Sequence, residues 1–251
     1  MTRMEIEVTG ARILFELPFG ITITATQVNM WLVMAGIAIV CAWLTHDLKV
    51  KPTSKRQIIA EYLVNTVENF VTGNMGPRWK WFVPYIAALF SLAMFSSLIS
   101  LLGMYPPTSD LNTTAGWAIM TFILITFYKI KSNGFFGYAK GLTEPIFIMT
   151  PMNVLGEFAT PLSMAFRMFG NVASGSVVSA LIYAALAALN QAVFGWLPGV
   201  LGEWASSFPI LQLGIPAILS LYFDVFSGVL QAFIFCMLTM LYIAAAADTE
   251  A

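Results

Sequence analysis

The sequence predicts an all-α membrane protein with about five transmembrane helices and one amphipathic interfacial helix. Composition is the first indication: apolar residues make up 59% of the 251 residues and charged residues only 10%. Soluble domains carry about 25% charged residues, so lipid must be the solvent for much of this chain. The other two observations are apolar windows that recur along the chain and basic residues that gather between them.

Five apolar windows approach the ~20 residues that a helix needs to cross a bilayer. We predict spans at 29–46, 82–103, 116–130, 150–190 and 212–247, within one membrane domain. The residues before them, 1–28, show no basic start followed by an apolar stretch. We therefore expect an external N-terminal segment there rather than a signal peptide.

The connection at 47–80 contains an amphipathic pattern. Apolar side chains recur in it at helical spacing: Ile58, Ile59, Leu63, Val67, Phe70 and Val71. The pattern predicts a helix that lies on the membrane surface or against a partner.

The basic residues predict the orientation of the chain. Those that flank the first connection are Lys49, Lys51, Lys55, Arg56, Arg78 and Lys80. Lys129, Lys131 and Lys140 lie between the third and fourth spans, whereas 105–115 and 190–212 contain no basic residue. By the positive-inside rule the two basic connections are cytoplasmic, the N-terminus is external and the C-terminus is cytoplasmic.

The fourth predicted span is too long for an ordinary crossing. About 40 helical residues at ~1.5 Å each reach about 60 Å, which is twice the thickness of the hydrocarbon core. The helix must therefore tilt steeply, lie partly in the membrane plane, or break. Pro161 is a site for a bend.

Arg167 lies inside this span, in LSMAFRMFGNVASG, with no acidic residue three or four positions away. A charge at the bilayer centre costs from about 3 to above 10 kcal/mol. One interpretation is that the side chain extends to an interface. The other is a fixed positive charge that faces a partner's carboxylate or a water-filled path, and the distance of Arg167 from both ends of the span favours it.

A helical projection places the small and polar side chains of this span within an arc of about 140°. They are Asn153, Gly156, Glu157, Thr160, Ser163, Arg167, Gly170, Asn171 and Ser174. The opposite face is bulky, with Leu155, Phe158, Leu162, Phe166 and Phe169. Close helix packing explains Gly170 and Ser174 but not the charged residues. Ser176 projects away from the arc, towards other helices of the chain.

The last span has a polar stripe of its own, at spacings of three and four. Its members are Ser220, Asp224, Ser227, Gly228 and Gln231. Asp224 alone has a second interpretation, as a solvated residue near a helix end. The stripe enters from the external end, whereas Asn153 to Ser163 enters from the cytoplasmic end and stops at Arg167. Two polar half-paths that meet at one arginine need a carrier that moves between them.

The sequence contains no nucleotide-binding loop, nucleophile elbow or metal-ligand cluster. His46 is the only histidine, and Cys41 and Cys236 fall in apolar runs, where we interpret them as small packing residues. We expect no catalytic residue, no metal, no cofactor and no nucleic-acid partner.

Several blocks resemble subunit a of F-type ATP synthases, in the family's order and over most of the chain. They are LPFGITIT at 17–24, GMYPPTSDLNTT at 103–114, PMNVLGE at 151–157, PLSMAFRMFGN at 161–171 and LQAFIFCMLTMLYI at 230–243. The Arg–x–Phe–Gly–Asn core is the specific signal. The resemblance implies a non-catalytic subunit whose Arg167 is the essential stator arginine.

The resemblance also implies roles for the other polar residues. Asn171, Gln231 and Ser163 match polar positions at the ring interface, and Glu157 and Asn153 match the cytoplasmic half-channel. The external half-channel takes Asp224, Ser220, Ser227, Ser176 and Asp110. Two positions depart from the common pattern: Ser176 stands where many members carry Glu or His, and Asp224 where many carry His or Glu.

The implied partners are a ring of c-subunits, each with a carboxylate that passes Arg167, the peripheral-stalk b subunits and the rest of the complex. The implied setting is the lipid bilayer of a bacterial plasma membrane, and the transported ion is H⁺ or Na⁺. A self-contained ion-coupled secondary transporter is the alternative. Transporters often contain internal repeats, and none is visible here.

Overall fold

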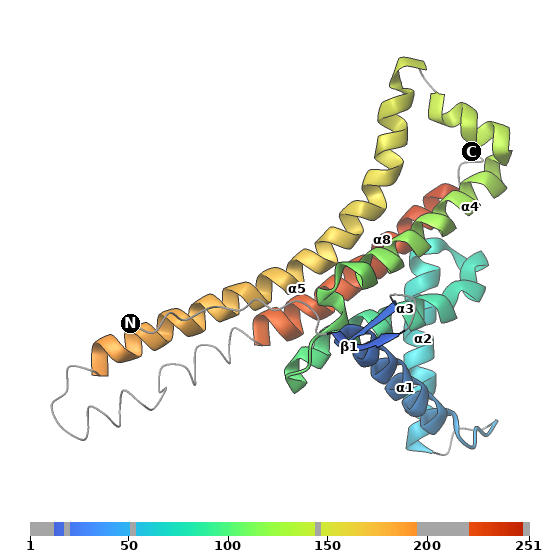
Figure 1. The fold of residues 1–251 in the computed structure, drawn as a ribbon. Coiled ribbons are helices and arrows are strands. Elements are labelled where there is room, and N and C mark those ends of the chain that lie inside the picture. Colours follow the sequence, from blue (N-terminus) through green and yellow to red (C-terminus); the bar gives the residue numbers. More distant parts are fainter. Residues whose placement is uncertain (1–12, 18–20, 51–53, 144–146, 195–220, 248–251) are drawn as a thin grey trace.

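The computed structural model describes residues 13–17, 21–50, 54–143, 147–194 and 221–247 (Figure 1). Within these residues, five helical segments are long and apolar enough to cross a membrane. The predicted class, an all-α membrane protein, is therefore confirmed. It is supplemented by one small β-hairpin that the sequence did not lead us to expect.

The hairpin lies in the predicted external segment. Strand β1 (Ile13–Leu17) pairs antiparallel with β2 (Ile21–Thr24), with a register shift between Ile13 and Phe15. Helix α1 (Ala25–Thr45) follows at once, so the first helix begins four residues before the predicted span. Its buried residues, Thr26, Asn29 and Val33, all lie near its start, and the rest of α1 is largely exposed.

Helix α2 (Lys55–Met75) covers the predicted amphipathic segment. Its second half packs on the bundle, where Val71 and Met75 are buried, whereas Ile58, Ile59 and Leu63 are exposed. The chain then turns at Gly76, whose φ is 91°. Within the described residues, the bundle covers one end of the apolar stripe of α2 and leaves the other end exposed.

Short 3₁₀ segments flank the next helix: η1 (Pro77–Phe82), α3 (Val83–Leu98) and η2 (Ile99–Leu102). After η3 (Pro107–Ser109), helix α4 covers Leu111–Thr143. The prediction of a short third span at 116–130 followed by a polar connection is thus wrong in its extent. Lys129, Lys131 and Asn133 lower the hydropathy without ending the helix, and Gly134 (φ 71°, ψ 165°) redirects it.

The fourth span is a single element. After η4 (Phe147–Met149), helix α5 covers Thr150–Phe194, 45 residues with Pro161 inside, or about 68 Å of helix. Figure 1 shows α5 running beside α4 and α8 and curving along its length. The helix therefore does not break within 150–190.

The last span begins with a π-helical turn, η5 (Leu221–Ser227), and continues as α8 (Gly228–Ala247). A π-turn bonds residues i and i+5 and holds more residues per turn than an α-helix. The α-helical projection of the stripe from Ser220 to Gln231 is therefore wrong across η5. Ser220 and the predicted start of the span at 212 lie outside the described residues.

The core lies where α3, α4, α5 and α8 meet. Ile86 from α3, Ala118 from α4, Met168 from α5 and Phe235 from α8 are almost completely buried there. This packing determines which face of α5 contacts the other helices of the chain. The polar residues of α5 lie on both sides of this buried face.

Candidate functional site

Arg167 lies on the exposed side of α5. Met164, Ala165 and Met168 are buried, whereas Ser163 and Arg167 are exposed. Among the described residues, Arg167 has no ion-pair or hydrogen-bond partner. No described residue therefore occupies the guanidinium.

Three other polar residues of α5 face neighbouring helices of the chain. Asn153, Glu157 and Asn171 are half-buried and hydrogen-bond to α4 or to η5. The expected polar face therefore divides in two, because an arc of about 140° is wider than one helix contact. Ser163 and Arg167 point outwards, and the other three point inwards.

Asn171 lies one helical turn after Arg167 and is bound on two sides. Its Nδ2 donates to Ser227 Oγ (2.7 Å), and Ser227 Oγ donates to Asn171 Oδ1 (2.9 Å). Nδ2 also lies 3.3 Å from the Ser227 carbonyl oxygen. The pair ties α5 to the end of the π-helical turn.

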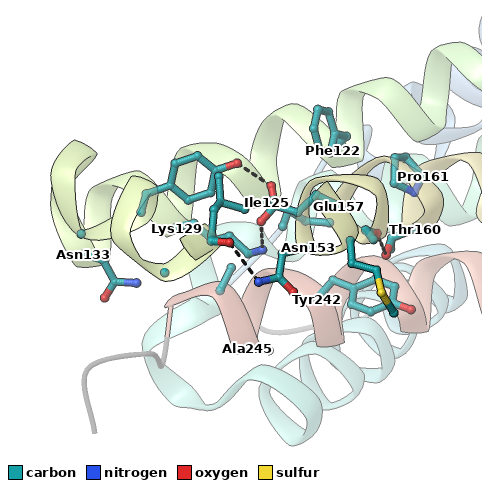
Figure 2. Close-up of a pocket in the computed structure, with 17 residues that line it drawn as sticks. Phe122, Ile125, Lys129, Asn133, Asn153, Glu157, Thr160, Pro161, Tyr242 and Ala245 are labelled. Carbon is teal, nitrogen blue, oxygen red and sulfur yellow. Dashed lines mark hydrogen bonds and ion pairs between the residues drawn. The ribbon is translucent and has the colours of Figure 1, made fainter. Parts of the chain in front are cut away.

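A cavity of about 660 Å³ opens between α4, the first part of α5 and the end of α8. Figure 2 shows Glu157 at its centre. Lys129 Nζ lies 2.5 Å from Glu157 Oε1, and the Tyr138 hydroxyl donates to Oε2. Asn153 Nδ2 donates to the Leu142 carbonyl oxygen (2.9 Å).

Lys129 and Tyr138 are the site residues that the sequence reasoning missed. Both were assigned to a polar connection, and they lie instead on α4, before and after Gly134. No clear signal marked them, because low hydropathy and the glycines at 134, 137 and 141 concealed the helix on either side of the bend.

Asp224 lies at the other end of α8, in η5, and is half-buried. The Ser100 side chain is within hydrogen-bonding reach of its carboxylate. Ser100 follows Ser97, whose hydroxyl lies 3.4 Å from that of the buried Thr108. The Ser100 hydroxyl of η2 is therefore a neighbour of Asp224 that the stripe on one helix did not reveal.

Three further expectations have specific outcomes. Ser176 is exposed and donates to its own backbone at Ala173, so it does not point into the bundle as expected. Gln231 is 6% exposed and lies in the bundle rather than on the outward face with Arg167. Asp110 caps α4, accepting from the Asn112 amide (3.0 Å) and from Thr26 Oγ1 (2.9 Å).

The described residues thus form two polar regions at opposite ends of the α5–α8 contact. Ten residues separate Glu157 from Arg167, about 15 Å of helix, and Asn171–Ser227 brings the Asp224 region to the other side of Arg167. The part of the chain that the structure describes contains no group of three His, Cys, Asp or Glu side chains placed to hold a metal ion. The chemistry that this arrangement offers is ion transfer.

The comparisons with known proteins agree with one another. The model of the family described as ATP synthase A chain matches residues 27–244. "ATP synthase subunit a, sodium ion specific" of Propionigenium modestum is 33% identical over 241 residues, 90% of this chain and 74% of that protein. "ATP synthase subunit a 2" of a Picosynechococcus species is 30% identical over 97% of this chain and 94% of that protein. "ATP synthase subunit a" of Anoxybacillus flavithermus is 33% identical over 90% of this chain and 93% of that protein.

Proposed function

This chain belongs to the ATP synthase A chain family, and from that premise we propose that it conducts H⁺ or Na⁺ through two offset half-channels separated by Arg167. Membership makes it a multi-pass, non-catalytic membrane subunit that works in a complex with other ATP synthase subunits. Na⁺ stands beside H⁺ because one 33% identical relative is named as sodium ion specific.

The observation that carries the proposal is the exposed, unpartnered Arg167 on a membrane-spanning helix. A permanent charge in that position is costly unless a partner brings an opposite charge to it. The partner is a ring of c-subunits, each with a carboxylate that passes Arg167 as the ring turns. The guanidinium favours the ionised carboxylate and prevents ions from passing directly between the half-channels.

The cavity around Glu157 and Asn153 is the cytoplasmic half-channel. Asp224, with Ser100 beside it, supplies the external one. Ser227 and Asn171 hold the two helices in register between them. In this assignment Ser163 lies at the ring interface with Arg167. Gln231 is buried in the helix bundle and does not contact the ring directly.

Contacts within the chain support a proposed orientation. The beginning of α1 meets the residue before α4 through Thr26 and Asp110, and the part of α4 just before Gly134 meets the end of α8 through Ser132 and Ala247. With the basic connections on the cytoplasmic side, the hairpin end is external and the C-terminus is cytoplasmic. The membrane is the bacterial plasma membrane, and the b subunits of the peripheral stalk join the complex there.

The test is ATP-driven pumping in inverted membrane vesicles. Arg167→Ala should abolish ion pumping while the detached catalytic head still hydrolyses ATP. Arg167→Lys should fail too, because a point charge does not replace a planar fork of donors. Normal pumping by the alanine variant would refute the assignment.

The self-contained transporter considered from the sequence is not favoured, because the relatives are named as subunits of an ATP synthase. Co-purification separates the two cases. A stator subunit isolates with a ring of small subunits, and a transporter isolates alone or as a homo-oligomer.

A further inference from the structure

We propose that Lys129 is the charge partner and positioning residue of Glu157, so that ions cross the cytoplasmic cavity past a neutral ion pair rather than by way of a free carboxylate. The inference rests on the proposed function and deepens it. It predicts that removing both charges does less harm than removing one.

The geometry leaves neither oxygen of Glu157 free. Lys129 Nζ lies 2.5 Å from Oε1, and the Tyr138 hydroxyl occupies Oε2. The Glu157 side chain is 14% exposed and that of Lys129 33%. An ion that arrives in the cavity therefore meets a carboxylate that already has two partners.

The charges around the cavity balance. Its titratable lining residues are Lys129 and Tyr138 from α4, Glu157 from α5 and Tyr242 from α8 (Figure 2). The one acidic and the one basic side chain among them, Glu157 and Lys129, form an ion pair, so the described lining has no net charge. Without Glu157 the lining would be positive and would repel the cation that the cavity must admit.

The pair also joins two helices at a bend. Lys129 lies before Gly134 and Tyr138 after it, so Glu157 holds both arms of α4 against α5. Replacing both members of a buried ion pair by uncharged residues is often tolerated, whereas removing one leaves an uncompensated charge. This asymmetry makes the inference testable.

The experiment measures passive proton flux through reconstituted complexes from which the catalytic head has been removed. Glu157→Gln and Lys129→Met should each lower the flux about tenfold, and the double variant should return to within about threefold of the unmodified protein. Lys129→Arg should keep the flux because it keeps the charge. Lys131→Met is the matched control, since Lys131 lies over the Tyr128 ring and does not line the cavity.

A double variant as slow as Glu157→Gln would overturn the inference and make Glu157 itself the ion carrier. The recovery of each variant with the complex is measured in parallel. If Glu157→Gln does not assemble, the comparison of Lys129→Met with Lys129→Arg decides. Equal flux in these two variants would also overturn the inference. Arg167→Ala, assayed for ATP-driven pumping with the catalytic head attached, tests the proposed function separately, since that function fails if this variant pumps normally.

Discussion

Asn171 and Ser227 exchange hydrogen bonds between α5 and the last residue of the π-helical turn, at 2.7 and 2.9 Å. Asn171 follows Arg167 by one turn, and Ser227 follows Asp224 by three residues. These hydrogen bonds therefore fix the position of Arg167 along the helix axis relative to Asp224, the only acidic residue described in the last span. One residue later, Gly228 packs against Ser97.

The first prediction is that the two members of this pair act as one unit. Asn171→Ala and Ser227→Ala should each destabilise the complex by about 1 kcal/mol, and the double variant should cost little more than either. Melting of the purified complex, read as a double-mutant cycle, measures the coupling. Ser174→Ala is the control, because its exposed hydroxyl bonds only to the Asn171 carbonyl within α5. Additive losses would show that the two side chains are independent.

The second prediction concerns the outward face of α5. A photocrosslinker attached to a cysteine at Ser163 should capture the ring subunit, because Ser163 is exposed beside Arg167. The same probe at Met164, one residue later and 2% exposed, should not. The exposed Cys41 and the buried Cys236 are first replaced by alanine. Equal yields at both positions would place the ring elsewhere.

Hydropathy and charge were enough to predict the membrane class, an amphipathic helix within 47–80 and Arg167 as the unusual charge. Hydropathy and charge patterns report the average environment of a segment. They could not show that α4 continues past Lys129, because lysines lower hydropathy while the helix remains intact. Nor could a projection of one helix show that Asn171 and Glu157 face inwards, since the direction depends on where α4 and α8 pack. The π-turn that contains Asp224 likewise breaks the period on which such a projection depends.

The third prediction tests the bend in α4. Gly134 adopts φ 71° and ψ 165°, a region open essentially to glycine and costing other residues about 1–3 kcal/mol. Gly134→Ala should therefore lower the melting temperature of the complex and loosen Tyr138 and Leu142 from α5. Gly116→Ala is the control on the same helix, because no heavy atom lies within 4 Å of the added Cβ. A melting temperature unchanged by Gly134→Ala would mean that α4 tolerates a straighter course.

The last prediction concerns Asp224. It is half-buried, Ser100 lies within hydrogen-bonding reach, and Ser176, the neighbouring candidate, does not titrate near neutral pH. Asp224 should then be the principal ionisable group of the external half-channel. Asp224→Asn should slow proton flux at least tenfold without preventing assembly, because the amide keeps the shape of the carboxylate and loses its proton exchange.

Conservative replacements sharpen this expectation. Asp224→Glu should recover part of the rate, and so should an acid placed at Ser176 in the Asp224→Asn background. Ser100→Ala should have a smaller effect, because it removes a hydrogen-bond partner and leaves the carboxylate. Flux is followed across a range of pH in reconstituted complexes without the catalytic head. An Asn variant with unchanged flux at every pH would mean that Asp224 is merely solvated. Water, or Asp110, which accepts from Thr26 Oγ1 and the Asn112 amide, would then have to serve the external entrance.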